Sequence, residues 1–152
     1  MYFDTLFSAS IKMFTLPDAI LVPVFGHLAL VFYLFVMVSI KRMKAVGEGQ
    51  ILTDDLAHKS NEPEASRRWA NNLNNQFEVP SLFYALIGLL YATASINWIY
   101  VSLAFIFLAG RILHTWVQVS GDNVGLRGKM FTINFLAVAL MWLMFFFDRW
   151  FF

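Results

Sequence analysis

An uncharged apolar run at residues 19–40 is the feature that most constrains the fold. It is 22 residues long, and a helix of about 20 apolar residues can cross the hydrocarbon core of a bilayer. Three further long apolar runs lie at residues 79–96, 98–119 and 130–147. Because lipid cannot hydrogen-bond the backbone, each run must form a helix. The sequence therefore predicts an all-α integral membrane protein, with four transmembrane helices in a single domain over residues 1–152.

The composition supports this class and excludes several others. Apolar residues make up 59% of the chain and charged residues 14%, whereas a soluble domain carries about 25% charged residues. The net charge of +1 gives no reason to expect a nucleic-acid partner. The 152 residues contain no cysteine, which excludes disulfides, thiolate metal ligands and cysteine nucleophiles within the chain.

The distribution of basic residues predicts how the helices are oriented. Most Lys and Arg residues fall in two of the connections between apolar runs: Lys41, Arg42, Lys44, Lys59, Arg67, Arg68, Arg127 and Lys129. The positive-inside rule then places the long loop at about residues 41–76 in the cytoplasm and both termini outside. No basic region precedes an apolar stretch at the N-terminus, so a secretory signal is not expected. Residues 1–17 are interpreted as a short interfacial segment, because aromatic residues alternate there with Asp4, Ser8 and Lys12.

Polar side chains inside the apolar runs gather at one level of the predicted bundle. Arg111, His114 and Gln118 follow at i, i+3 and i+7 and share one helix face. At 1.5 Å per residue, Arg111 lies about 21 Å below the outer boundary, close to the cytoplasmic side. The second helix has a polar face at the same level, made of Asn71, Asn75 and Glu78. Basic residues at this level lie at the end of the first helix and the start of the fourth: Lys41, Arg42 and Arg127. The second helix is expected to run unbroken from Glu64 into the membrane.

Two interpretations of this polar cluster remain open. In one, it is a structural network in which Glu78 pairs with Arg111, since buried ions are normally paired. In the other, it is a pocket for an anionic, peptide-like ligand, because Arg binds carboxylates and Asn offers both a donor and an acceptor. Glu78 is one acid and cannot neutralise the several Arg and Lys residues at this level. The excess of positive charge favours the second interpretation, in which an anion from outside the chain completes the cluster. That anion could be a ligand or a lipid phosphate.

A haem site is not expected, although His27 and His114 both lie in apolar runs. Bis-histidine ligation needs both rings at one depth, and the helical rise puts His27 about 13 Å and His114 about 25 Å from the outer face. His27 is interpreted as a satisfied core or lipid-boundary residue. No metal site is expected either.

Two short motifs resemble those of the MAPEG family, the membrane-associated proteins of eicosanoid and glutathione metabolism. Residues 75–80, Asn-Gln-Phe-Glu-Val-Pro, resemble the family's Asn-x-x-Glu followed by Pro on helix two. Residues 111–114, Arg-Ile-Leu-His, with Arg127 sixteen residues after Arg111, resemble the Arg-x-x-His/Tyr signature of helix three and the Arg that opens helix four. The chain looks most like bacterial members, which implies the bacterial inner membrane.

The resemblance implies a homotrimer that binds glutathione between subunits near the cytoplasmic surface. The residues matching glutathione-contacting or neighbouring positions would be Asn75, Glu78, Arg111, His114, Asn71, Gln118 and Arg42. Arg127 would be the catalytic residue, because a nearby cation favours the thiolate, which is the nucleophile. Glutathione would be a co-substrate that supplies the thiol. A hydrophobic small molecule would be the second substrate and would enter from the surrounding lipids.

Departures from the family pattern narrow this expectation. The chain has Asn71 where many members have Arg, Gln118 where many have Tyr, and Gly128 after Arg127 where the prostaglandin-synthase branch has Ser. Prostaglandin and leukotriene synthesis are therefore not expected. The predicted function is a glutathione-dependent transferase or peroxidase. The alternatives are a non-catalytic structural or accessory membrane protein, whose cluster is internal or binds lipid, and a membrane partner of a larger complex.

Overall fold

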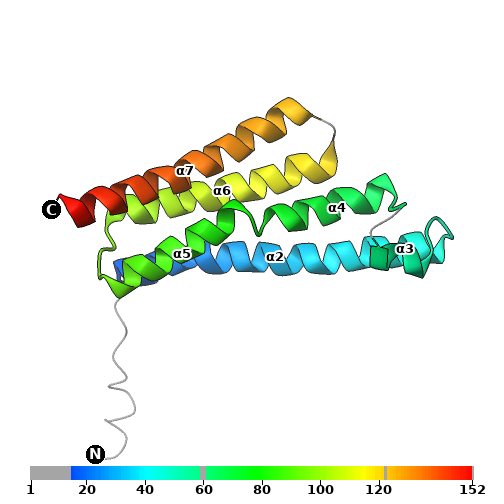
Figure 1. Cartoon of the computed structure of the whole chain (residues 1–152), viewed down its shortest axis with the longest axis horizontal. Coiled ribbons are helices and arrows are strands. Elements are labelled where there is room, and N and C mark those ends of the chain that lie inside the picture. The colour runs from blue at the N-terminus through cyan, green and yellow to red at the C-terminus, as the bar shows by residue number, and fades with distance from the viewer. Residues whose placement is uncertain (1–14, 59–60, 122, 152) are drawn as a thin grey trace, which may run out of the picture.

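The computed structural model describes residues 15–58, 61–121 and 123–151, and every regular element in these ranges is a helix. In chain order these are α2 (Leu16–Gly47), α3 (Thr53–His58), α4 (Glu64–Asn75), α5 (Val79–Ala92), α6 (Trp98–Ser120) and α7 (Val124–Trp150). Figure 1 shows α2, α6 and α7 lying along the long axis, with α4 and α5 following one another beside α2. Most of the interfacial segment predicted at residues 1–17 lies outside the described residues.

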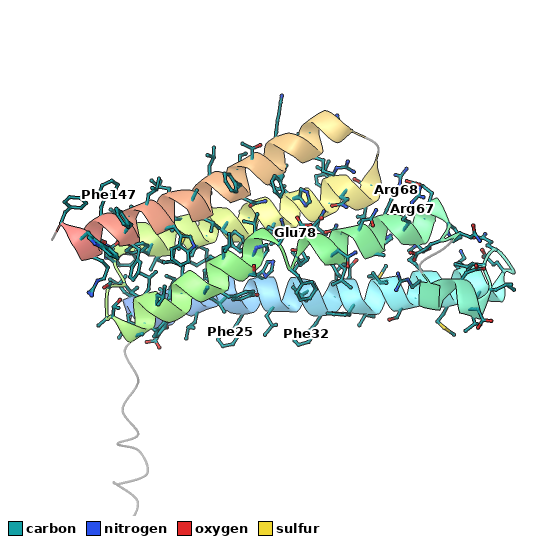
Figure 2. All side chains as sticks on the ribbon, viewed as in Figure 1. Phe25, Phe32, Arg67, Arg68, Glu78 and Phe147 are labelled. Carbon is teal, nitrogen blue, oxygen red and sulfur yellow. The ribbon has the colours of Figure 1, made fainter. Side chains whose placement is uncertain are left out.

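Three of these helices are long and apolar enough to cross a membrane. They are α2, α6 and Gly125–Trp150 of α7. Helix α5 has 14 residues, or about 21 Å at the helical rise, against about 30 Å for the hydrocarbon core. Large side chains on the outer faces, such as Phe25, Phe32 and Phe147 (Figure 2), are at least half exposed, as expected where lipid is the solvent. The fourth span, on α5, stays a prediction.

Side-chain caps define where three of the helices begin. Thr15 caps α2, with Asp18 accepting back from the Thr15 backbone N–H at 3.0 Å. Asn97 accepts from the first turn of α6 at 3.0 and 3.3 Å, and Asn123 accepts from Leu126 at the start of α7. These caps satisfy backbone donors that have no partner inside the helix.

The helix predicted to run unbroken from Glu64 is interrupted, so this expectation is wrong. Helix α4 ends at Asn75 and α5 begins at Val79. Pro80 explains the break: it has no N–H for the carbonyl of Gln76, four residues earlier, and its ring would clash with that carbonyl. The chain instead turns tightly through residues 76–78, where the Gln76 and Phe77 N–H groups bond to carbonyls three residues back. The break lies in the middle of the polar cluster and is labelled at Glu78 in Figure 2.

Close packing of α6 against α5 and α7 fixes the helix that bears Arg111. Phe107 stacks on Phe83 of α5 with ring centroids 4.2 Å apart. Gly110 faces α7, where a Cβ atom on residue 110 would lie 2.2 Å from Asn134 Oδ1. A residue with a Cβ atom at this position would force the Asn134 side chain to move. The register between α6 and α7 is therefore set directly beside Arg111.

Candidate functional site

Arg111 is completely buried and hydrogen-bonded at the break between α4 and α5. Its Nε and Nη2 donate to Gln76 Oε1 at 3.0 and 2.7 Å, and Nη2 also donates to the Asn75 carbonyl at 2.8 Å. Nη1 has no hydrogen-bond partner among the described residues. The ion pair between Arg111 and Glu78, which belonged to the structural-network interpretation, is not formed: Glu78 is exposed and the guanidinium is bonded to neutral oxygens instead. The turn at residues 76–78 points Gln76 inward and leaves Glu78 outside.

Gln76 is the centre of this buried network. Its Oε1 also contacts His27 Nε2 of α2 at 3.0 Å, and His27 Nδ1 contacts the Tyr84 hydroxyl of α5 at 2.6 Å. Because a carbonyl oxygen only accepts, His27 must carry its proton on Nε2, and Nδ1 then accepts from Tyr84. His27 is 0% exposed with both ring nitrogens bonded, which confirms it as a satisfied core residue.

A second set of amide contacts holds α4 against α6 on the loop side of Arg111. Gln76 Nε2 donates to Asn72 Oδ1 at 2.8 Å, and Thr115 Oγ1 donates to the same oxygen at 3.2 Å. Asn72 Nδ2 donates in turn to the Thr115 carbonyl. One turn further, Asn75 Nδ2 donates to Gln118 Oε1 at 3.2 Å. Five amide and hydroxyl side chains near the break, in two separate sets, thus connect α4 and the break to α6.

An open groove of about 390 Å³ lies outside this network. Its walls come from α4, the break, α6 and the start of α7, and its lining residues are Asn71, Asn74, Asn75, Glu78, Gln118 and Arg127. Five of these were predicted as site residues. Arg127 is half-buried and forms no ion pair with a described acid. The groove therefore offers one guanidinium, one carboxylate and several amides to a ligand.

A smaller pocket of about 250 Å³ also borders Arg127. It shares Asn75 and Arg127 with the groove, and His114, Gly128 and Phe131 complete its lining. The Phe131 ring lies 6.3 Å from the His114 ring, and Gly128 leaves open space because nothing lies within 4 Å of a Cβ placed there. His114 is 2% exposed, and its Nδ1 has no partner among the described residues. Arg127 thus borders both a polar groove and a pocket with aromatic lining.

Arg42 is the predicted site residue that the structure places elsewhere. Its Nε and Nη2 donate to the two carboxylate oxygens of Glu62 at 2.7 and 3.2 Å. These hydrogen bonds, and the positive charge behind them, hold the pKa of Glu62 below its usual range. Arg42 lines a neighbouring pocket that shares only Asn71 and Asn74 with the Arg127 groove. Arg42 is therefore not one of the cations that would need an anion from outside the chain.

A comparison of the sequence with known protein families assigns the chain to one of them. The sequence profile of the MAPEG family matches residues 20–147, which is most of the chain. The chain belongs to the MAPEG family. The family includes glutathione transferases and peroxidases as well as non-catalytic members, and with three long apolar helices it makes this chain an integral membrane protein. No curated protein and no solved structure gave a match to the chain.

Sequence reasoning missed two residues that organise the site of this MAPEG protein. Gln76 lies inside the Asn-x-x-Glu motif, but a neutral amide gives no charge signal that would single it out. Glu62 lies in the loop, twenty residues after Arg42, where no helical spacing links the two. The one available signal was Pro80, which predicts that a helix ends nearby.

Proposed function

We propose that this MAPEG protein is a glutathione-dependent transferase or peroxidase that acts on hydrophobic compounds. The observation that carries the proposal is the position of Arg127, a guanidinium without a described carboxylate partner that borders both an amide-lined groove and an aromatic pocket. A peptide thiol in the groove would bring its sulfur toward Arg127, where an apolar molecule in the adjoining pocket would meet it.

The polar groups of the groove suit the chemistry of glutathione. Glu78 can accept from the ligand's ammonium, and Asn71 can bond its amides or carboxylates. Asn75 presents a side chain whose backbone is held by Arg111 at 2.8 Å. Arg111 then acts from behind the groove by fixing its wall, while Gln118 holds Asn75 from α6. His114 lines the adjoining pocket. Arg42 would act on the ligand only if its pair with Glu62 opens.

Arg127 would lower the pKa of the bound thiol and so raise the population of thiolate. In a transfer, the sulfur forms a bond to an electrophilic carbon while the leaving group departs with its electron pair. In peroxide reduction, the sulfur attacks one peroxide oxygen, the O–O bond breaks, and the alcohol leaves. The resulting sulfenic acid condenses with a second glutathione to give the disulfide and water.

Binding of glutathione to detergent-solubilised protein is the direct test. Calorimetry and thermal unfolding should show saturable binding, with about 2.7 kcal/mol of stabilisation at 100 times the dissociation constant. Arg127→Ala should reduce thiolate absorbance and turnover more than it weakens binding, and Asn75→Ala should weaken binding. Lys129→Ala is the matched control, since it removes an exposed cation two residues away on the same helix. Normal turnover in Arg127→Ala would contradict the proposal.

The rival function is a non-catalytic membrane protein of the same fold. The observation that favours it is the internal bonding of Arg111 to Gln76 and Asn75, which makes the buried part of the cluster structural. On this hypothesis Arg111→Ala impairs folding or assembly, and glutathione changes neither stability nor any measured activity. The homotrimer, the inner-membrane location and the orientation with both termini outside form part of the proposal in either case. Chemical cross-linking and accessibility labelling of introduced cysteines test them.

A further inference from the structure

The pocket of about 250 Å³ beside Arg127 has two aromatic rings and a glycine in its lining. The rings belong to Phe131 and His114, with centroids 6.3 Å apart and planes inclined by 55°. Gly128 directly follows Arg127 on α7 and lies three residues before Phe131, so these three residues fall within little more than one helical turn. The pocket thus combines aromatic rings with an open position at Gly128.

Neither the backbone nor close packing explains a glycine at position 128. Glycine is favoured where φ is positive, as at Gly49, or where another segment comes close, as at Gly110 beside Asn134. Gly128 lies within α7 without a positive φ, and no atom lies within 4 Å of a Cβ placed there. Glycine is the least favourable residue within a helix after proline. The chain therefore keeps a helix-destabilising residue at a position that lines the pocket.

A flat aromatic ring can use more of this lining than an aliphatic chain can. Aromatic rings gain from offset or edge-to-face contacts with other rings, which Phe131 and His114 both offer. A guanidinium also stacks on the face of a ring, and Arg127 is half-buried and forms no ion pair with a described acid. An aliphatic chain would gain from apolar contact alone. An aryl group is therefore the occupant that the lining favours.

We propose that Gly128 is a specificity-determining residue that gives an aromatic ring of the second substrate room beside Arg127. The inference rests on the proposed function, in which a thiol in the groove meets an apolar molecule in this pocket. It adds the class of that molecule, namely compounds that carry an aryl group next to the reacting atom. A larger side chain at position 128 takes the space of the ring, whereas the groove, whose lining does not include Gly128, stays unchanged.

Two thioether derivatives of glutathione test the inference without any need for turnover. S-benzylglutathione and S-ethylglutathione differ by a phenyl ring in place of a methyl group, and calorimetry measures the Kd of each for the full-length protein in detergent. Gly128→Leu fills the open position. Gly125→Leu is the matched control on the same helix, because Gly125 is exposed, does not line the pocket, and a Cβ there makes only an ordinary contact of 3.7 Å with Asn123 Oδ1. Circular dichroism and size-exclusion chromatography show whether each variant is folded and assembled like the wild type.

The wild type is expected to bind S-benzylglutathione about tenfold more tightly than S-ethylglutathione, because the additional ring is removed from water. Gly128→Leu should abolish most of this difference by weakening binding of the benzyl derivative, and Gly125→Leu should preserve it. Gly128→Ala should unfold at a higher temperature than the wild type, since alanine favours the helix and its Cβ meets no atom.

Equal affinity of the wild type for the two derivatives, or an undiminished difference in Gly128→Leu, would overturn the inference and leave glutathione binding intact. Loss of assembly in Gly128→Leu or Gly128→Ala would assign the glycine to a contact between copies of the chain and would also overturn it. Failure of the wild type to bind either derivative is a distinct result, because it would contradict the proposed function and this inference with it.

Discussion

Replacing Gln76 by Leu removes the oxygen that α2 and α6 share, while keeping a side chain of similar volume. In the wild type that oxygen accepts from Arg111 Nε and Nη2 and contacts His27 Nε2. In the variant, Arg111 Nη2 still donates to the Asn75 carbonyl. Arg111 Nε and the His27 N–H lose their acceptor. Arg111 is 0% exposed, so water cannot replace the lost bonds.

The expected loss in free energy of unfolding is about 3–5 kcal/mol. A buried donor without an acceptor costs about 1–3 kcal/mol, and more when it is charged, and breaking a buried charged contact costs about 3–5 kcal/mol. Hydrogen bonds between membrane helices average only about 0.6 kcal/mol, because partners also exist in the unfolded state. The range of about 3–5 kcal/mol applies to Gln76→Leu, because the variant retains the buried Arg111 guanidinium without its main acceptor.

Reversible unfolding in sodium dodecyl sulfate, followed by tryptophan fluorescence, measures this loss. Gln76→Glu should lose less, because a carboxylate still accepts from Arg111 and adds charge attraction. Removing both groups in Gln76→Leu/Arg111→Leu should cost less than the sum of the single changes, as the uncompensated charge is gone. Asn74→Leu, on the exposed side of α4, is the control. A loss below about 1 kcal/mol for Gln76→Leu would refute the assignment of Gln76 as the centre of the network.

Two further predictions concern α6 packing and the loop. Gly110→Ala should lower the free energy of unfolding by about 1–3 kcal/mol, because its Cβ would lie 2.2 Å from Asn134 Oδ1. Gly88→Ala, which meets nothing within 4 Å, should cost less than half as much in the same assay, and equal costs would contradict this. Since Arg42 lowers the pKa of Glu62 from its ordinary value of 4.5, the pair stabilises the fold above that pH and its contribution is lost as the pH falls below it. Thermal unfolding should show Glu62→Gln less stable than wild type near neutral pH and similar to it in acid, and a constant difference would refute the linkage.

The membrane class and most helix positions were predictable from sequence. Uncharged runs such as residues 19–40 allow only a buried or lipid-facing helix, because the backbone must be satisfied internally. The helices at residues 16–47, 98–120 and 124–150 contain three of the predicted runs. The residues that line the Arg127 groove were also predictable in part. Asn71, Asn75 and Glu78 follow helical spacing, and the motif order matched the family.

The sequence by itself determined that the chain is helical, belongs in a membrane, and gathers its polar residues at one level. Only the tertiary structure decided which of those residues bond to each other. Gln76, and not Glu78, accepts from Arg111: its side chain is buried beside the guanidinium, whereas Glu78 is exposed. Glu62 neutralises Arg42 across a loop that has no periodic pattern. Both outcomes depend on contacts between distant segments, and spacing along one helix carries no information about them.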